Sequence, residues 1–294
     1  MGKSGYVTLA GRPNVGKSTL LNRIVGRKIA ITSPLAQTTR NRITGVLTRQ
    51  DLQIIFVDTP GIMREKSKLN KIMVSTSIKS GGESDLLVYM ADATKISIKE
   101  EKFTLQRLMG VKASKILAIN KIDAVKKNDL LSLIDEMNKI ALFTEIFPIS
   151  ARTGDGVDEM VDHIARVLPE GPQFYPDDMV TDQPEEFFIG EIIREKAFMN
   201  LSQELPYSTA VVVESVEDKP EGVTVIGAII YVERESQKGI MIGKGGSMLK
   251  KIGSQARVEL EERFQVKIYM DLRVKVRDKW TVNERSLMNL GYKK

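Results

Sequence analysis

An eight-residue loop near the start of the chain constrains the fold more than any other feature: Gly11-Arg12-Pro13-Asn14-Val15-Gly16-Lys17-Ser18. An apolar run, residues 6–10, comes directly before the loop, and a helical pattern beginning at Thr19 comes directly after it. A strand, a glycine-containing turn and a helix in this order form a cradle for phosphate, because the backbone N–H groups and the helix dipole both favour anions. The sequence therefore predicts an α/β fold that binds a nucleoside triphosphate.

The side chains of this loop have separate predicted roles. Its glycines let the backbone curl closely around phosphate, Lys17 reaches the outer phosphates, and the Ser18 hydroxyl can bind Mg²⁺. The predicted nucleotide contacts here are Gly11, Asn14, Val15, Gly16, Lys17, Ser18 and Thr19. Because this pattern also occurs by chance, the flanking strand and helix carry much of the inference.

Composition sets the size of the protein and removes several kinds of site. The 294 residues are enough for two domains at roughly 150 residues each. No apolar run approaches the roughly 18 residues that a membrane-spanning helix needs, and the first residues carry no apolar export signal. The chain has no Cys and one His, His163, which excludes thiolate and imidazole-rich metal centres. These features favour a cytoplasmic protein.

Strand-like runs alternate with polar or helical sequence through the first 170 residues. They cover residues 6–10, 54–57, 86–91, 116–119 and 146–149, and residues 44–48 are a candidate antiparallel edge strand. This alternation predicts a mostly parallel, six-stranded sheet covered by helices. The proline-rich stretch that follows can be neither one helix nor a central strand. We therefore predict an α/β domain in residues 1–170, a linker in 171–184 and a smaller α+β domain in 185–294.

The smaller domain carries the net positive charge of the chain. Between Lys238 and Lys279 there are eleven Lys or Arg against five Asp or Glu, whereas the rest of the chain has equal numbers of each. The predicted elements of this domain are a helix at 186–201, strands at 209–216 and 223–233, a helix at 247–264 and a strand at 266–276. A basic excess confined to one compact segment is typical of proteins that bind an anionic partner, with RNA the first candidate.

Three further motifs follow the ends of predicted strands, where ligands of open α/β sheets bind. They are Asp58-Thr59-Pro60-Gly61, Asn120-Lys121-Ile122-Asp123 and Ser150-Ala151-Arg152. We expect Asp58 to hold Mg²⁺ through water and the Gly61 N–H to donate to the γ-phosphate. Asp123 can accept two hydrogen bonds from the guanine N1–H and 2-amino groups, a pair that adenine cannot supply.

The other residues of these motifs complete a predicted guanine site, whose ligands are GTP and GDP. Lys121 lies along the base and the Ala151 N–H donates to the guanine O6, with Asn120 and Ser150 beside them. Each motif also has a plainer interpretation, as a turn cap, a polar strand end or a helix N-cap. Their joint occurrence at strand ends favours the nucleotide site.

Taken together, these motifs resemble those of the translation-factor-like GTPases over essentially the first 170 residues. The resemblance implies a switch threonine that binds Mg²⁺ and the γ-phosphate, within residues 34–42. We choose Thr39 over Thr38, because related GTPases place Arg directly after this threonine; the alternative is that both are only loop hydroxyls. The implied metal ligands are Ser18, Thr39 and Asp58, and the implied catalytic groups are Lys17, Thr39 and Gly61.

Two positions bear on how hydrolysis would proceed. Ras-type GTPases place a glutamine after Asp-x-x-Gly to orient the attacking water, whereas this chain has Ile62. The water must then be held by backbone, switch residues or a partner, which predicts slow intrinsic turnover. Asn14 occupies the loop position that binds K⁺ in potassium-activated relatives, and a turn-forming asparagine is an equally good interpretation.

A second glycine turn lies inside the basic segment. Gly243-Lys244-Gly245-Gly246 follows Ile240-Met241-Ile242 and introduces the predicted helix at 247–264. A Gly-x-x-Gly turn of this kind is the loop with which KH domains clamp about four nucleotides. The candidate RNA contacts are Ile240, Gly243, Lys244, Gly245, Gly246 and Lys250, whereas Ile242 and Ile252 are better assigned to the core. Trp280 can stack on a base, but packing against the final helix is the better interpretation.

The order of elements around this turn resembles the bacterial type II KH domain, and nearly the whole chain resembles the Era family of bacterial GTPases. Strings that carry the resemblance include the phosphate loop, Gln-Thr-Thr-Arg at 37–40, Glu-Ile-Ile-Arg-Glu-Lys at 191–196 and Glu-Leu-Pro-Tyr-Ser at 204–208. The resemblance implies a GTP-dependent switch that binds the 3′ region of 16S rRNA and acts in 30S subunit assembly. It also implies a peripheral contact with the cytoplasmic face of the inner membrane, and we expect a monomer.

Two alternatives remain open from the sequence. One is an RNA-binding protein that keeps GTP as a structural ligand, which Ile62 makes conceivable. The other is a GTPase of membrane or cell-cycle signalling in which RNA binding is incidental.

Overall fold

The computed structural model describes residues 2–140, 142–220 and 222–292, and divides the chain into two compact units. The first comprises residues up to 66 together with Asn70–Asp182, and the second comprises Ser67–Leu69 together with the chain from Gln183 onward. The first unit is an α/β domain and the second is a smaller α+β domain, as the sequence predicts.

The first unit is built on a six-stranded sheet with strand order β2-β3-β1-β4-β5-β6. Its strands are β1 (Lys3–Gly11), β2 (Ile43–Arg49), β3 (Leu52–Asp58), β4 (Leu86–Asp92), β5 (Ser114–Asn120) and β6 (Ile146–Ile149). Every residue of β4 is buried, as expected for a central strand covered on both faces. Only β2 runs antiparallel, so the predicted edge strand is confirmed.

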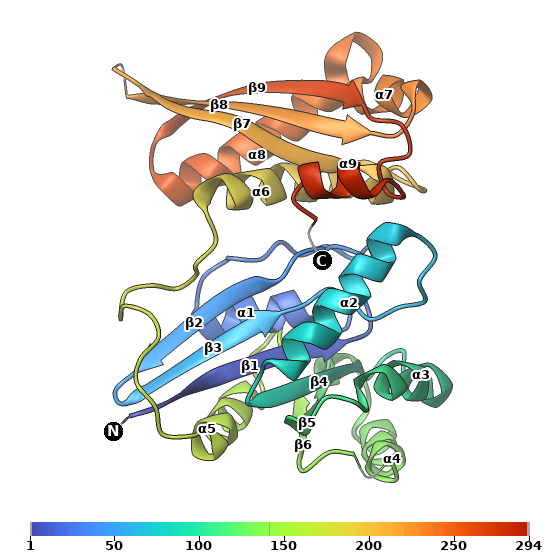
Figure 1. The fold of residues 1–294 in the computed structure, drawn as a ribbon, viewed down its shortest axis with the longest axis vertical. Helices are drawn as coiled ribbons and strands as arrows, with labels where there is room; N and C mark the ends of the chain where they lie inside the picture. Colours follow the sequence, from blue (N-terminus) through green and yellow to red (C-terminus); the bar gives the residue numbers. More distant parts are fainter. Residues whose placement is uncertain (1, 141, 221, 293–294) are drawn as a thin grey trace. The chain divides into compact units, whose positions relative to one another are not determined.

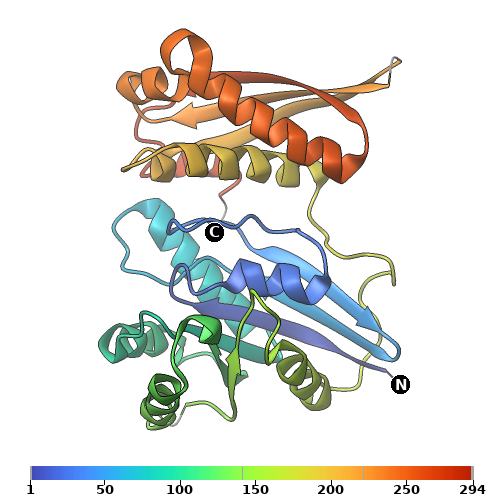
Figure 2. The same ribbon diagram turned by 180° about the vertical axis from the view of Figure 1, so that it is seen from behind.

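Helices cover both faces of this sheet (Figures 1 and 2). They are α1 (Lys17–Val25), α2 (Lys68–Gly82), α3 (Ile98–Leu108), α4 (Lys127–Asn138) and α5 (Val157–Val167). Apolar residues of α2, α3 and α4 pack with Ala10, Tyr89 and Leu117 in one buried cluster. Because β1, β3, β4, β5 and β6 are parallel, their carboxyl ends meet at one edge of the sheet, which is where the predicted motifs lie.

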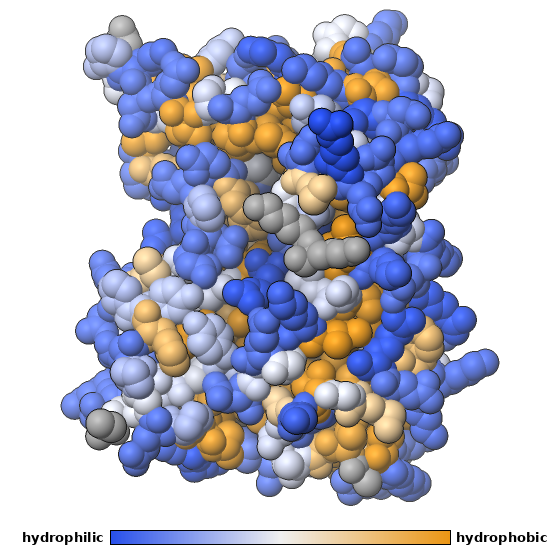
Figure 3. Space-filling model, viewed as in Figure 1, coloured by the Kyte–Doolittle hydropathy of each residue, from blue (hydrophilic) through white to orange (hydrophobic). Residues whose placement is uncertain are grey.

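The second unit has a three-stranded sheet of order β7-β8-β9. Its elements are α6 (Glu185–Asn200), β7 (Ala210–Lys219), β8 (Val223–Val232), α7 (Glu235–Ile242), α8 (Ser247–Phe264), β9 (Lys267–Val276) and α9 (Glu284–Asn289). Helices α6 and α8 pack together on one face of the sheet, as the two ribbon views agree. On the other face, apolar side chains lie over β7 and β8 within a largely hydrophilic surface (Figure 3).

The sequence located most strands and the helices with a strong apolar period. It assigned no range to α2, α3, α7 or α9. The segment of α2 is rich in Ser and Lys and has no clear apolar stripe, and α7 and α9 are only 8 and 6 residues long. Such segments are held as helices by packing more than by their own periodicity.

Most of the proline-rich segment predicted as a linker lies against the first unit. Val46 N donates to Val180 O at 2.9 Å, and Thr181 Oγ1 donates to Thr44 O at 2.7 Å. The buried Gln53 side chain accepts from the Phe174 N–H and donates to Tyr175 O. Residues 171–182 therefore form a strap along the first sheet, and the division into 1–170, 171–184 and 185–294 stays a prediction.

Candidate functional sites

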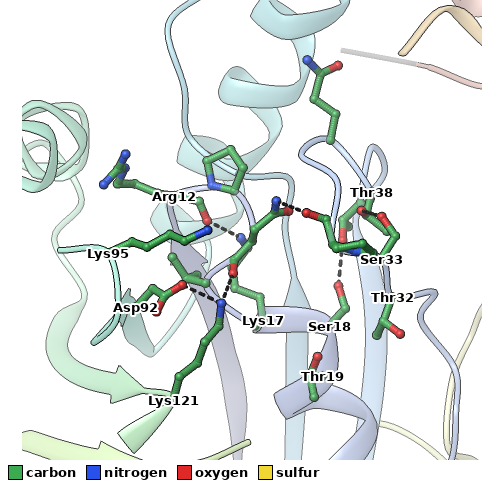
Figure 4. A pocket seen from close by; sticks show the side chains of 18 of the residues that line it. Arg12, Lys17, Ser18, Thr19, Thr32, Ser33, Thr38, Asp92, Lys95 and Lys121 are labelled. Carbon is green, nitrogen blue, oxygen red and sulfur yellow. Dashed lines mark hydrogen bonds and ion pairs between the residues drawn. The ribbon is translucent and has the colours of Figure 1, made fainter. Parts of the chain in front are cut away.

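The phosphate-binding loop leads from β1 into α1 and lines a cavity of about 430 Å³ (Figure 4). Gly11 and Gly16 have φ values of 149° and 101°, which a side chain at these positions would strain. The Asn120 amide lies 2.2 Å from where a Cβ on Gly16 would be, so the close approach also requires glycine. The rest of the lining comes from residues 31–34 and 37–39, from Gly61 and from Asp92, Lys95, Glu101 and Lys121.

Lys17 is buried at the base of this loop. Its Nζ donates to Arg12 O at 3.1 Å, and 6% of the residue is exposed. Burial lowers the pKa of Lys17, and the nearby Asp58 carboxylate raises it in part. A cation fixed in the loop at the helix N-terminus suits the outer phosphates of a nucleotide.

Three oxygen-bearing side chains from different elements meet beside Lys17. Ser18 Oγ lies 2.8 Å from Thr39 Oγ1 and donates to Asp58 Oδ2 at 2.5 Å, and Thr39 Oγ1 donates to the same oxygen at 3.2 Å. The other carboxylate oxygen, Asp58 Oδ1, is buried and makes no hydrogen bond with the described part of the chain. Burial raises the pKa of Asp58, whereas Lys17 and the two hydroxyls lower it.

This donor set fits a magnesium ion. Hydroxyl and carboxylate oxygens are the ligands that Mg²⁺ prefers, and its usual octahedron leaves positions for phosphate and water. A buried carboxylate oxygen that lacks a protein partner is costly unless an ion or water satisfies it. Ser18, Thr39 and Asp58 are therefore the residues that would hold the metal.

The two candidate switch threonines have different surroundings. Thr38 Oγ1 lies 2.7 Å from Ser33 Oγ and donates to Leu35 O at 2.7 Å, within a local turn. Only Thr39 brings its hydroxyl to both Ser18 and Asp58. The geometry thus favours Thr39, the choice made from the sequence.

The segment after β3 is packed closely against the phosphate loop. A Cβ on Gly61 would lie 2.6 Å from Pro13 N, and Ile62 N donates to Gly11 O at 3.0 Å. Ile62 is 1% exposed, and its side chain lies in the core cluster with Ala10. The Ile62 side chain therefore points away from the cavity and cannot orient a water molecule there.

The predicted base-binding residues lie together at the ends of β5 and β6. Asp123 accepts from Ser150 Oγ at 2.6 Å and from the Arg152 guanidinium at 2.6 Å. Asn120 Nδ2 donates to Val15 O at 2.7 Å, which joins this region to the phosphate loop. The hydrogen bond from Ser150, and then that from Arg152, lowers the pKa of Asp123.

One arrangement here differs from the sequence prediction. The Ala151 N–H donates to Asn120 Oδ1 at 2.9 Å, so its donation to guanine O6 would share or replace this hydrogen bond. Of the five predicted base contacts, Lys121 lines the cavity in Figure 4, whereas Asn120, Asp123, Ser150 and Ala151 lie outside its lining.

Lys121 has a partner that the sequence reasoning missed. Its Nζ donates to Asp92 Oδ2 at 2.5 Å and to Asn14 O at 2.9 Å. Asp92 is the last residue of β4, so its position at a strand end was the signal available. Burial raises the pKa of Asp92, but its contacts with Lys121 and Thr94 outweigh this and lower it.

Asn14 connects the phosphate loop to the loop before β2, residues 34–42, which holds the two candidate switch threonines. Its φ is 63°, and its Nδ2 donates to Pro34 O at 2.7 Å. Asn14 also lines the nucleotide cavity, so both the turn-forming role and a contact with K⁺ fit its position.

The second unit presents its glycine turn at the start of α8. Gly243, Gly245 and Gly246 have φ values of 73°, 60° and 81°, and a Cβ on Gly245 or Gly246 would meet only open space. Lys244 and Lys250 are exposed, and Ile240 is 58% exposed. The main chain of this turn is therefore accessible to the phosphates of a bound RNA strand, with the Lys244 and Lys250 cations and the apolar Ile240 side chain in the same part of the unit.

A groove of about 470 Å³ begins at this turn and runs between α8 and β9. Its lining includes Leu249, Lys250, Gly253, Arg257 and Tyr269; the sequence reasoning missed Arg257 and Tyr269. Ile252 is fully buried and Ile242 is half-buried.

Trp280 belongs to the core of this unit. It is fully buried, its Nε1 donates to Ser208 O at 2.8 Å, and its ring stacks on Tyr292 with 5.6 Å between centroids. The side chain therefore cannot stack on a base, and the packing interpretation is the right one.

Comparisons with known proteins agree with this two-part architecture. A model of the 50S ribosome-binding GTPase family matches residues 6–121, and a KH domain model matches residues 204–281. GTPase Era of Geobacter sp. (strain M21) is 49% identical over 290 residues, which cover 99% of this chain and 98% of that protein. GTPase Era of Ruminiclostridium cellulolyticum is 45% identical over 291 residues, with coverage of 99% and 98%.

Two of the solved structures similar to this chain extend over nearly its whole length. A single-residue variant of Aquifex aeolicus Era bound to GDP and AlF4⁻ has a TM-score of 0.94 and 41% identity, covering 99% of this chain and 100% of that one. An Era structure in complex with MgGDPNP and nucleotides 1506–1542 of 16S ribosomal RNA has a TM-score of 0.96 and 41% identity, with both chains fully covered. The chain described here therefore belongs to the Era family of GTPases, with an N-terminal GTPase domain and a C-terminal KH domain.

Proposed function

We propose that this protein is a GTP-hydrolysing switch that binds the 3′ region of 16S rRNA and acts in assembly of the 30S subunit in the cytoplasm. The observation that carries the proposal is the open Gly243–Gly246 turn beside the α8–β9 groove, in a chain that also holds a phosphate cradle. The relative whose structure includes nucleotides 1506–1542 of 16S rRNA supplies the candidate RNA.

The nucleotide is held, in this proposal, by two groups of residues. The phosphates lie on the loop from Gly11 to Thr19, with Lys17 on the outer phosphates. The base lies against Asp123 and Lys121, with Asn120, Ser150 and Ala151 closing the site behind it. Two donors on guanine match the two carboxylate oxygens of Asp123, which gives the preference over adenine.

Hydrolysis relies on positioning and on charge stabilisation, because phosphoryl transfer needs little covalent help from the protein. Lys17 neutralises charge on the outer phosphates, and the Gly61 N–H donates to the γ-phosphate. Ser18, Thr39 and Asp58 would hold Mg²⁺, which supplies further charge neutralisation when bound. Since the buried Ile62 cannot hold the attacking water, backbone groups near Thr39 and Gly61 remain to do so, and intrinsic turnover is slow.

RNA binds through the turn and the groove. The backbone of Gly243, Gly245 and Gly246 approaches the phosphates, Lys244 and Lys250 contribute charge, and Ile240 offers an apolar surface to a base. The unpaired character of the bound strand follows from the turn, which clamps splayed nucleotides rather than a duplex.

Crosslinking of RNA to the protein in cells, followed by sequencing of the bound RNA, tests this function directly. We expect reads to concentrate at the 3′ end of 16S rRNA for the wild-type chain and to diminish for Lys17→Ala. Gly245→Asp places a carboxylate in the turn and should remove the enrichment. The control is Lys126→Gln at an exposed position of the first domain, which lowers the net charge by the same amount and should leave the enrichment unchanged. Reads spread evenly over cellular RNA would contradict the proposal.

Two finer points belong to the same proposal. Asn14 binds K⁺ at the cavity mouth, so replacing K⁺ by Na⁺ should slow hydrolysis several-fold, and Asn14→Ala should remove the difference.

We also propose a monomer that touches the inner membrane peripherally. Sedimentation with anionic vesicles tests the peripheral contact. The helices in the described part of the chain include no candidate for a membrane-spanning segment.

A further inference from the structure

A buried acidic side chain lies behind the phosphate loop and has no part in the roles assigned so far. Glu101 of α3 is 1% exposed and lies at the wall of the nucleotide cavity. Its Oε1 accepts from the Arg12 guanidinium at 3.2 Å, and its Oε2 accepts from Tyr89 Oη at 2.5 Å. Both carboxylate oxygens are thus engaged, one by the phosphate loop and the other by the central strand β4.

Stability alone is a weak reason for a carboxylate at this depth. Taking a charge out of water is costly, and well-packed apolar side chains often replace a buried ion pair without loss of stability. Burial raises the pKa of Glu101, and the contacts with Tyr89 and Arg12 work against that shift. A buried carboxylate that accepts hydrogen bonds fixes the position of its donors, and one donor to Glu101 is the Arg12 guanidinium.

Arg12 connects Glu101 to the lysine of the phosphate loop. The Arg12 side chain points away from Lys17 toward α3, whereas the Arg12 carbonyl accepts from Lys17 Nζ at 3.1 Å (Figure 4). On its other side the loop meets Gly61, since a Cβ there would lie 2.6 Å from Pro13 N. Residues 12 and 13 therefore lie between α3 and the segment after β3, and Glu101 holds Arg12 on the α3 side.

We propose that Glu101, supported by Tyr89, is a positioning residue for GTP hydrolysis that acts through Arg12 to hold the phosphate loop and Lys17 in place. The inference rests on the proposed role of Lys17 at the outer phosphates. It concerns the chemical step and not nucleotide binding. Lys17 must already be in place to stabilise the negative charge that develops on those phosphates as the bond to the leaving group breaks.

The test is single-turnover and steady-state GTP hydrolysis by the full chain carrying Glu101→Gln. This change keeps the shape of the side chain and removes its charge. We expect kcat to fall roughly tenfold or more while KM changes less than about threefold, since small misplacements of a catalytic group act on the chemical step. Tyr89→Phe should lower kcat in the same direction by a smaller factor.

The control is Glu100→Gln, the same chemical change one residue away. Glu100 pairs with Arg64 at 3.4 Å on the surface, so its kcat should stay within twofold of wild type. A double-mutant cycle with Arg12→Met separates positioning from general stability: if Glu101 acts through Arg12, the double variant should match Arg12→Met alone. A cooperative thermal unfolding transition, measured for each variant, checks that the chain is folded.

Two outcomes would overturn the proposal: a folded Glu101→Gln variant with kcat near wild type, or additive effects in the cycle. If Glu101→Gln fails to fold, Tyr89→Phe and Arg12→Met still test the proposal, because an unchanged kcat in both variants would also overturn it. Lys17→Ala separates the two levels of inference. Loss of hydrolysis in Lys17→Ala together with normal Glu101→Gln rejects only the role of Glu101, whereas normal hydrolysis in Lys17→Ala rejects the site itself.

Discussion

At the scale of single residues, the strongest feature is how each motif residue is held by another motif. Asn120 joins the base region to the phosphate loop through Val15, and Lys121 does the same through Asn14. The sequence indicated these residues because each follows a strand. It could not indicate that Arg12 and Glu101 are partners, because their contact depends on how α3 packs beside the loop.

Asp123 sets the expected choice of base. Asp123→Asn replaces one acceptor by a donor, which mismatches the guanine N1–H and 2-amino groups but matches the oxygen on C2 of xanthine. We expect GTP affinity to fall by roughly 10² or more and XTP affinity to rise, since sites with unpaired polar groups reject a ligand strongly. Competition of both nucleotides against a fluorescent GDP analogue measures the change; unchanged preference for GTP would remove Asp123 from the base site.

The same residue predicts a pH dependence of stability. Because Ser150, and then Arg152, lowers the pKa of Asp123 below its unfolded value of about 3.9, the folded chain binds fewer protons there than the unfolded chain. The stabilisation is present above that value and is lost as the pH falls through the lowered pKa. The difference in Tm between wild type and Asp123→Asn, without nucleotide, should be constant from pH 8 to about 5 and shrink below about pH 4.

At the scale of elements, the switch segments depend on close contacts with the phosphate loop. Gly61 is a clear case, because a Cβ there would overlap Pro13. We expect Gly61→Ala to lower GTP hydrolysis by roughly 10²-fold while GDP affinity changes little, because the clash with Pro13 moves the residue 61 N–H away from the γ-phosphate and so has the effect of losing one preorganised donor. Phosphate release and GDP titration measure the two quantities; an equal loss of both would indicate a folding defect instead.

The packing of the KH domain around Trp280 gives a second prediction at this scale. Trp280→Ala removes a fully buried indole and should cost about 3–5 kcal/mol of stability, whereas Trp280→Phe should cost about 1–3 kcal/mol, since Ser208 O loses its donor. RNA affinity of the folded Trp280→Phe variant should equal that of wild type. Denaturant unfolding and RNA titration test both statements; weaker RNA binding with normal stability would restore a role in base stacking.

At the scale of the whole molecule, two ligand sites in one chain allow coupling that must be reciprocal. If GTP raises RNA affinity by some factor, RNA must raise GTP affinity by the same factor. We expect RNA corresponding to the 3′ end of 16S rRNA to bind more tightly with a GTP analogue than with GDP. Titrations in both directions measure the two factors, and identical RNA affinity with GTP analogue, with GDP and without nucleotide would reject the switch.

The sequence predicted the two folds and their motifs because glycine turns, strand ends and charge are local signals. It did not predict that residues 171–182 lie along the first sheet, since prolines identify a break in regular structure but not what the broken segment contacts. It also did not place Arg257 and Tyr269 in the lining of the groove, because they become neighbours only when β9 packs beside α8.

The strap along β2 covers an edge strand on which a second copy of the chain could otherwise pair. β2 ends the sheet, and an uncovered terminal strand is a template on which a second copy can add its backbone. Val180 and Thr181 already occupy hydrogen-bonding groups along that border, and the prolines around them cannot extend the sheet further. We therefore expect the covered border to limit strand-to-strand association between copies of this chain.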